Sequence, residues 1–147
     1  LRLRAEWPTV IGREELADRL GSVVLLDARA APRYRGEAEP IDPVAGHIPT
    51  ARSAPTDRYT GTDGRLLPPE ALIEVLDSLG ATGAEGPVVT SCGSGVTATF
   101  ASLAMRVAGL PDPILSPGSY SDWSRSGMPV ATGPDPGDRP AELDRSG

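Results

Sequence analysis

The chain has 147 residues, of which 39% are hydrophobic, and a formal net charge of −6, which fits one soluble globular domain. The negative charge argues against a nucleic-acid partner, and no apolar run approaches the roughly 20 residues that cross a bilayer. Lysine, asparagine and glutamine are absent, which excludes Schiff-base chemistry and a Cys-His-Asn protease triad. The single cysteine excludes an internal disulfide and favours a reducing, cytoplasmic compartment.

The first half of the chain predicts one helix and one strand. Residues 13–20 have apolar side chains at helical spacing and are followed by Gly21, a typical helix stop. Residues 23–26 form a continuous apolar run before Asp27, as in a strand that is covered on both faces. The stretch 35–68 is rich in proline, glycine and aspartate, so we expect it to wrap the sheet edge with little regular structure.

The second half repeats this pattern. Residues 69–79 predict a helix with a proline in its first turn and Gly80 at its end. Residues 88–89 predict a short buried strand, and residues 97–107 predict a third helix. Strands that alternate with helices indicate an α/β domain with a mainly parallel sheet.

Ligands of such sheets bind beyond the carboxyl ends of the strands, where Asp27 and Cys92 fall. Beyond residue 131 the chain is rich in glycine, proline and aspartate and has few side chains to bury. We therefore predict a catalytic domain over residues 1–131 and a flexible tail over residues 132–147.

Cys92 lies in a glycine-rich turn between the second predicted strand and the third predicted helix. Gly93 and Gly95 permit a tight turn that exposes successive N–H groups, and the helix adds the positive end of its dipole. Such a loop stabilises a thiolate and lowers its pKa, so Cys92 is predicted to be a nucleophile. The N–H groups of this cradle, those of Val96 and Thr97 included, are predicted to bind substrate. The alternative is a small buried cysteine that ends the strand.

Other chemistries fit this loop less well. A phosphatase with a similar loop has an arginine six residues after its cysteine, where this chain has Ala98, so a dianionic phosphate would be bound poorly. One cysteine and one histidine are too few for a metal site, and disulfide exchange lacks a second cysteine. A persulfide needs only a thiolate and N–H donors around its outer sulfur. We expect no metal and no cofactor.

The loop Cys92-Gly93-Ser94-Gly95-Val96-Thr97-Ala98 resembles that of 3-mercaptopyruvate sulfurtransferases in the rhodanese-type sulfurtransferase family. Other stretches resemble the family in the same order: Leu26-Asp27-Ala28-Arg29 with Arg33-Tyr34-Arg35-Gly36, Gly46-His47-Ile48-Pro49, and Gly118-Ser119-Tyr120-Ser121-Asp122-Trp123 with Pro129-Val130. The similarity is to the C-terminal catalytic domain of tandem enzymes and covers about residues 8–133. It implies a rhodanese-like α/β domain with a five-stranded, mainly parallel sheet flanked by helices.

The resemblance also implies a reaction. Cys92 would take a sulfur atom from a small donor as a persulfide and pass it to cyanide or a thiol acceptor. Arg33 matches the arginine that binds the acidic group of the donor, and Ser94 is a candidate to relay a proton or to hydrogen-bond the substrate. Because Gly93 and Ser94 supply no positive charge, we expect 3-mercaptopyruvate to be favoured over thiosulfate.

Three conspicuous side chains are expected to have structural roles. His47 belongs to the Gly-His-Ile-Pro turn, where its ring would satisfy nearby backbone groups. Asp27 would anchor loop backbone or Arg29, and Trp123 would pack in the core.

The chain departs from the family pattern at several positions. Thr50 and Ser53 stand where the family often has glycine and asparagine. Some members have a second arginine on the donor, but its place, near Asp42, is not basic here. Members with this loop usually carry an N-terminal rhodanese-like domain that forms one wall of the site, so such a domain is a candidate partner.

Two functions stay open on the sequence alone. The first is a sulfurtransferase with Cys92 as its nucleophile. The second is a non-catalytic sulfur-carrier or regulatory module that a partner protein loads. Activity on a small donor separates them, because a carrier would be loaded by protein far better than by mercaptopyruvate.

Overall fold

The computed structural model describes residues 10–82, 86–91 and 98–143. The described residues form a four-stranded sheet in the order β2-β1-β3-β4, and every pairing between these strands is parallel. The strands are β1 (Val24–Asp27), β2 (Arg52–Ser53), β3 (Val88–Ser91) and β4 (Ile114–Leu115).

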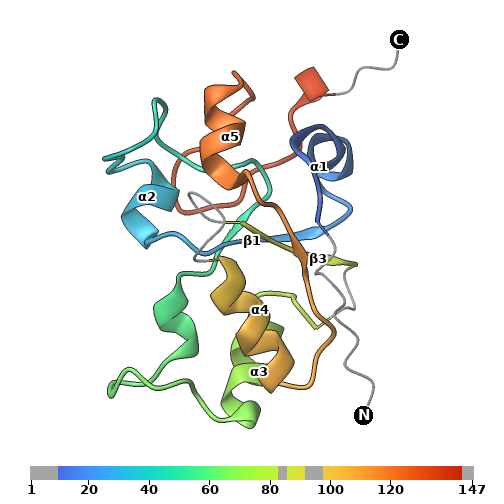
Figure 1. Ribbon diagram of the computed structural model, residues 1–147. Helices are drawn as coiled ribbons and strands as arrows, with labels where there is room; N and C mark the ends of the chain where they lie inside the picture. Colours follow the sequence, from blue (N-terminus) through green and yellow to red (C-terminus); the bar gives the residue numbers. More distant parts are fainter. Residues whose placement is uncertain (1–9, 83–85, 92–97, 144–147) are drawn as a thin grey trace.

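Helices cover both faces of this sheet (Figure 1). One layer contains α1 (Arg13–Arg19), α2 (Ala31–Arg35) and α5 (Ser119–Arg125). The other contains α3 (Pro69–Ser78) and α4 (Ala98–Val107). The 3-10 helix η1 (Thr56–Tyr59) follows β2, and the 3-10 helix η2 (Ala141–Leu143) is the last element of the described chain.

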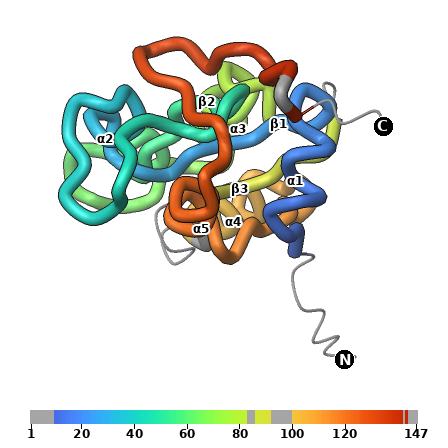
Figure 2. Tube along the Cα trace, turned by 90° about the horizontal axis from the view of Figure 1, so that it is seen from above, coloured from blue at the N-terminus to red at the C-terminus, as the bar shows by residue number. Residues whose placement is uncertain are grey.

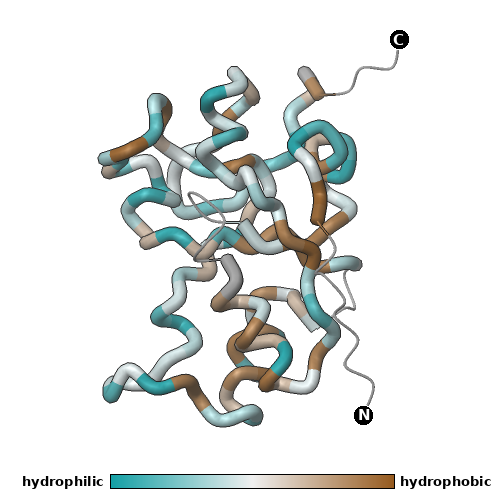
Figure 3. Tube along the Cα trace, in the orientation of Figure 1, coloured by the Kyte–Doolittle hydropathy of each residue, from teal (hydrophilic) through white to brown (hydrophobic). Residues whose placement is uncertain are grey.

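The apolar run at β1 explains why the sheet is covered twice. Successive side chains of a strand point to opposite faces. Val24 and Leu26 belong to the apolar cluster beneath α3 and α4, whereas Val23 and Leu25 belong to the cluster beneath α1, α2 and α5. Figure 3 shows the hydrophobic residues along the central strands and on α3 and α4. Trp123 is 1% exposed in the second cluster, which confirms its predicted place in the core.

The predicted α/β class is confirmed, but the predicted number of strands is wrong for the part of the chain that is described. That part has four strands, and a single parallel bridge between Val10 and Leu115 is the only trace of a further pairing beside β4. The helices predicted over 13–20, 69–79 and 97–107 correspond to α1, α3 and α4. Short elements were not predicted: α2, β2, β4 and α5.

The stretch predicted to lack regular structure contributes to the sheet. Within it, β2 pairs with the end of β1, with Leu26 opposite Arg52 and Asp27 opposite Ser53. Directly after β2, η1 places Tyr59 in the apolar cluster of α3 and α4. A strand of two residues leaves almost no periodic signal in a sequence, which is why it was not predicted.

Residues 132–143, predicted to be a flexible tail, contact the domain at several points. They run from α5 back toward α1 (Figure 2). The carbonyl oxygen of Pro136 accepts from the backbone N–H of Thr50 at 2.9 Å, the Arg139 guanidinium donates to the carbonyl oxygen of Ala17, and Leu143 packs on the second cluster. The predicted boundary at residue 131 stays a prediction. In the described residues, every helix is too short or too polar to cross a membrane.

Candidate functional site

The carboxyl ends of the parallel strands lie at one edge of the sheet. Here β1 ends at Asp27 and β3 ends at Ser91, and these two residues are directly paired. A cavity of about 540 Å³ opens at this edge, with walls from α2, η1 and α5. Side chains from these elements and from the connecting loops line it, among them Ala28, Arg33, Ile41, Pro55, Asp57 and Ser121.

Six predicted site residues lie in the segment that joins β3 to α4. Cys92, Gly93, Ser94, Gly95, Val96 and Thr97 fall outside the residues that the structure describes. The described chain reaches Ser91 before this segment and resumes in α4 at Ala98. The nucleophile, the proton relay and the anion cradle therefore stay predictions.

Arg33, the predicted donor-binding residue, lies on α2 and lines the cavity. Pro32 occupies the first turn of α2, and Gly36 ends the helix in the left-handed region with φ of 82°. Tyr34 is 1% exposed and donates to the carbonyl oxygen of Ala51 at 2.5 Å, whereas the Arg33 side chain is 20% exposed. The buried Tyr34 therefore fixes this short helix to the domain, and the neighbouring Arg33 faces the cavity.

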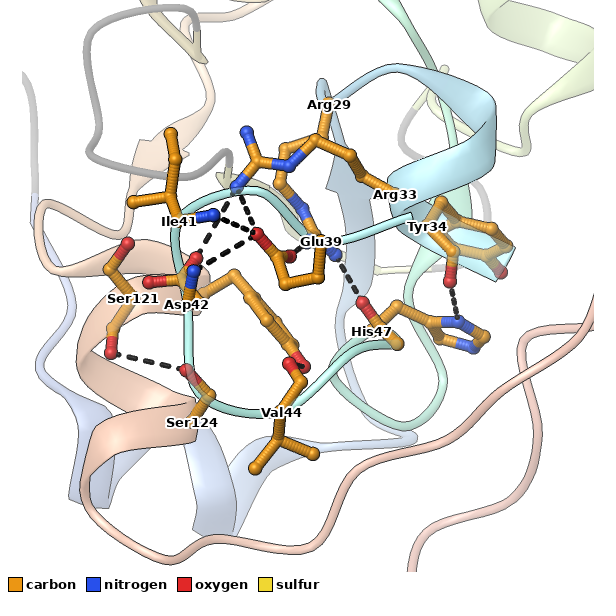
Figure 4. A network of polar contacts seen from close by, with 12 residues as sticks. Arg29, Arg33, Tyr34, Glu39, Ile41, Asp42, Val44, His47, Ser121 and Ser124 are labelled. Carbon is orange, nitrogen blue, oxygen red and sulfur yellow. Dashed lines mark hydrogen bonds and ion pairs between the residues drawn. The ribbon is translucent and has the colours of Figure 1, made fainter. Parts of the chain in front are cut away.

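Two carboxylates contact the same nitrogen of Arg33 (Figure 4). Its Nη2 donates to Glu39 at 2.9 Å and, at a longer 3.4 Å, to Asp42. Its Nε is buried, and no described residue accepts a hydrogen bond from it. The guanidinium has five N–H donors, so these two contacts leave it incompletely paired.

Glu39 is the centre of this network. Its Oε2 also accepts from the backbone N–H groups of Ile41 at 3.2 Å and Asp42 at 3.0 Å, and its Oε1 accepts from Arg29 at 3.3 Å. Burial raises the pKa of Glu39, but hydrogen bonds from these two N–H groups and from Arg33 outweigh burial, so the pKa lies below its ordinary value. Glu39 is thus ionised at neutral pH and bridges both arginines.

Asp42 is the second carboxylate on Arg33, and its side chain is completely buried. Its Oδ1 lies 3.7 Å from Nε of Arg125 on α5 and has no hydrogen bond within the described chain. The neighbouring Ile41 lines the cavity and is 65% exposed. The position near Asp42, where some family members have a second arginine, therefore has an apolar side chain on the cavity wall and a buried carboxylate beside it.

Arg29, four residues before Arg33, is fully engaged. Its Nη2 donates to Asp27 at 2.8 Å and to the carbonyl oxygen of Gly46 at 2.6 Å, and its Nε contacts the same Asp27 carboxylate. The guanidinium lies 3.9 Å from the centre of the Tyr120 ring, and the side chain is 1% exposed. These contacts confirm that Asp27 anchors Arg29.

Tyr120 closes the same network from α5. Its hydroxyl donates to the carbonyl oxygen of Val44 at 2.5 Å. Burial raises the pKa of Tyr120 to about 12, Arg29 opposes that change, and the nearby carboxylates, Glu39 first, add to it. The hydroxyl therefore stays protonated and holds the loop that carries Asp42.

His47 supports the loop on the far side of Arg29. It is completely buried, its Nδ1 lies 2.8 Å from the carbonyl oxygen of Tyr34, and its Nε2 lies 3.1 Å from that of Pro136. Its backbone exchanges hydrogen bonds with Ala131, and its ring stacks on Tyr34 at 3.8 Å. Gly46 has φ of +135°, and a Cβ there would collide with the carbonyl oxygen of Ala131. These contacts confirm the predicted structural role of His47.

Reasoning from the sequence identified Arg33 but not the acids around it. Glu39 and Asp42 follow Arg33 within ten residues, together with Glu37, and this local excess of carboxylates was the available signal. The contribution of Arg125 depends on the packing of α5 and leaves no local signal. In the described residues, no three His, Cys, Asp or Glu side chains gather in a way that would hold a metal ion.

The arrangement favours one small, singly charged anionic group in the cavity. Arg33 is the cation on its wall that retains unused N–H donors, whereas Arg29 is consumed by its own partners. Glu39, Asp42 and the cavity-lining Asp57 oppose further negative charge. The described wall thus offers one incompletely paired cation to an anionic ligand.

The chain is similar to known proteins over most of its length. Residues 12–126 match the family described as Rhodanese-like domain. The chain is 51% identical over 112 residues to a probable 3-mercaptopyruvate sulfurtransferase of Pseudomonas aeruginosa, covering 76% of this chain and 39% of that protein. It is 45% identical over 104 residues to a putative thiosulfate sulfurtransferase of Mycobacterium tuberculosis, covering 71% of this chain and 36% of that protein.

A solved structure shows the same fold. The sub-stoichiometric sulfur transferase subunit of yeast mitochondrial complex I matches with a TM-score of 0.76 at 27% identity, over 88% of this chain and 48% of that chain. This chain thus spans less than half the length of each of these relatives.

Proposed function

The chain belongs to the rhodanese-like domain family, and from this premise we propose that it is a sulfurtransferase with Cys92 as its nucleophile. It takes a sulfane sulfur from a small donor, for which 3-mercaptopyruvate is favoured over thiosulfate, and transfers it to a thiol or to cyanide. The relatives with 51% and 45% identity carry sulfurtransferase names, which supports this proposal.

One observation carries the proposal. The paired strand ends at Asp27 and Ser91 bring the chain to the rim of a cavity whose wall contains the incompletely paired Arg33. The residue that follows Ser91 in the sequence is Cys92. An incompletely paired guanidinium beside the strand edge from which the predicted nucleophile continues supports the proposal.

The first half of the reaction loads the enzyme. The Cys92 thiolate attacks the sulfur atom of mercaptopyruvate, and an S–S bond forms while the C–S bond of the donor breaks. The electron pair of the broken bond leaves with the carbon as the enolate of pyruvate, which takes up a proton. Arg33 would bind the carboxylate throughout this step, because a guanidinium pairs well with that group. Ser94 is the proposed proton relay.

The second half regenerates the thiolate. An acceptor thiolate or cyanide attacks the outer sulfur of the Cys92 persulfide, and the S–S bond breaks. Its electron pair returns to Cys92, and the product leaves as a persulfide or as thiocyanate. No external oxidant or reductant is needed, because the sulfur moves between nucleophiles.

Charge around the cavity supports the proposed choice of donor. Thiosulfate is a compact dianion, and Glu39 and Asp42 already oppose the positive charge of Arg33. Mercaptopyruvate has one carboxylate, which a single arginine can pair. Gly93 and Ser94 add no cation beside the predicted nucleophile.

Intact-mass spectrometry tests the proposal directly. After incubation with mercaptopyruvate and removal of the donor, the protein should gain the mass of one sulfur atom and should lose it on addition of cyanide. The Cys92→Ser variant should gain nothing, because a serine hydroxyl is not an acceptor for sulfane sulfur. A wild-type protein that gains no sulfur from mercaptopyruvate or thiosulfate but does so from a persulfide-carrying protein would favour the carrier function instead.

A further inference from the structure

The contacts of Arg33 are unequal, and the inequality bears on substrate binding. Glu39 lies 2.9 Å from Nη2, whereas Asp42 lies 3.4 Å from the same nitrogen (Figure 4). A charge-assisted hydrogen bond is typically about 2.7–2.9 Å long, so the contact with Glu39 is well formed and that with Asp42 is weak. An incoming anion would therefore replace the contact of Arg33 with Asp42 more easily than its contact with Glu39.

The rest of the network keeps Glu39 in place. Its carboxylate accepts from two backbone N–H groups and from Arg29 in addition to Arg33. Removing Glu39 from Arg33 would break a set of bonds that also shapes the loop. Glu39 is thus a permanent partner of the arginine.

Asp42 has no comparable set of partners. Its side chain is fully buried, its Oδ1 accepts no hydrogen bond from any described residue, and its two cationic neighbours lie at 3.4 and 3.7 Å. A buried carboxylate without good hydrogen bonds is costly, and its attraction to nearby cations is what compensates. Its negative charge therefore acts on Arg33, the nearer of the two.

We propose that Asp42 is a specificity-determining residue, a built-in competitor that lowers the affinity of Arg33 for the acidic group of the donor. This inference rests on the proposed function, in which Arg33 binds that group. A donor with one carboxylate replaces the weak contact of Asp42 with a bidentate pair. A dianion gains little more from the same arginine and meets the repulsion of both acids, so Asp42 also raises the selectivity for monoanions.

Arg125 tunes this competition from the other side. Its Nε is 3.7 Å from Oδ1 of Asp42, and its side chain is 62% exposed on α5. By partly neutralising Asp42, it weakens the hold of that carboxylate on Arg33. Loss of Arg125 should therefore act in the direction opposite to loss of the Asp42 charge.

Binding to a protein that cannot turn over the donor tests the inference. In the Cys92→Ser background, calorimetry would measure the Kd of 3-mercaptopyruvate with and without Asp42→Asn. We expect this change to lower the Kd about fivefold. This factor corresponds to the upper range of the free energy of an ion pair that is not fully desolvated. Arg125→Gln should weaken binding about twofold. Glu37→Gln is the matched control, because it removes a carboxylate of the same segment that pairs with Arg35 and contacts no other described cation.

A double-mutant cycle identifies the cause. If Asp42 acts on Arg33, the effect of Asp42→Asn should vanish in the Arg33→Ala background. An unchanged or weaker Kd in Asp42→Asn, or tightening that persists without Arg33, would overturn the inference. If Asp42→Asn does not fold, Asp42→Ser is measured in its place. If neither variant folds, the Kd of Arg125→Gln is the test, and an unchanged or tighter Kd in that variant would overturn the inference. Because Kd is measured without turnover, absence of sulfur transfer in the wild-type protein would refute the proposed function and leave this result intact.

Discussion

Arg29 and Arg33 stand four residues apart, yet their surroundings differ in how completely their N–H donors are paired. Arg29 is 1% exposed and is engaged by two carboxylates, a backbone carbonyl and an aromatic ring. Arg33 is 20% exposed, uses one nitrogen for two acids and leaves a buried Nε without a described partner. An arginine whose donors are satisfied within the protein has little left for a ligand. Incomplete pairing beside a cavity is therefore a better indicator of binding than arginine itself.

The largest expected effect tests whether Arg29 stabilises the fold. Arg29→Ala should lower the free energy of unfolding by about 3–5 kcal/mol, because it leaves the buried Asp27 carboxylate without its cationic partner. Urea denaturation followed by circular dichroism would measure this loss. The exposed Arg106, which pairs with Asp112, is the matched control, and Arg106→Ala should cost less than about 1 kcal/mol.

The next largest expected effect tests whether Arg33 binds the donor. Arg33→Ala should destabilise the fold less than Arg29→Ala, because Asp42 keeps its contact with Arg125 and Glu39 keeps its other hydrogen bonds, but it should raise the KM for mercaptopyruvate by about 30-fold or more, equivalent to about 2 kcal/mol. Steady-state assays of pyruvate release would measure KM. Arg35→Ala, on the same helix and outside the cavity, should leave KM unaltered. Equal KM values for the two alanine variants would contradict the division of roles between the two arginines.

Glu39 joins both arginines, and its pKa gives a prediction about pH. The pKa of Glu39 is lowered in the folded protein, so its contribution to stability is complete above the unfolded value of about 4.3 and is lost as pH falls through the folded value. Glu39→Gln should therefore lower Tm at pH 7, and the difference from wild type should narrow below about pH 4. Thermal melts across this range would measure it. A difference in Tm that stays constant with pH would show that ionisation of Glu39 contributes nothing.

The smallest effect tests the loop whose Gly46 carbonyl accepts from Arg29. Thr50 adopts a positive φ of 74°, which is unfavourable for a β-branched residue. Thr50→Gly should raise the free energy of unfolding by about 0.5–1 kcal/mol, since glycine relieves that strain but gains entropy when unfolded. Thr60, with φ of −122°, is the control, and Thr60→Gly should destabilise by a similar amount. Destabilisation by Thr50→Gly would mean that the left-handed conformation is not strained.

The sequence was informative about the fold where the pattern is long. The apolar run before Asp27 and the periodic stretch from Pro69 predicted β1 and α3 to within a residue or two at each end. Two-residue strands such as Arg52–Ser53 have no such pattern, because their pairing comes from the neighbouring strand. Their existence depends on tertiary structure.

The site shows the same limit. Arg33, His47 and Asp27 could be assigned from motifs, since each belongs to a contiguous stretch of sequence that resembles the family. The contact of Asp42 with Arg125 joins α5 to the loop after α2, across residues far apart in the chain. Such pairing follows from packing and could not be predicted from local spacing.

The hydrogen bonds of His47 to Ala131 and Pro136 bear on where this domain can be cut. The family match ends at residue 126, but Ala131, which exchanges backbone hydrogen bonds with His47, and Pro136, next to Thr50, both lie beyond it. A gene fragment that stops at the family limit would leave the buried imidazole and the Gly-His-Ile-Pro turn facing water. The unit to be expressed, crystallised or fused to a tag should therefore include the contacts of residues 131–143, which lie beyond the end of the family match at residue 126.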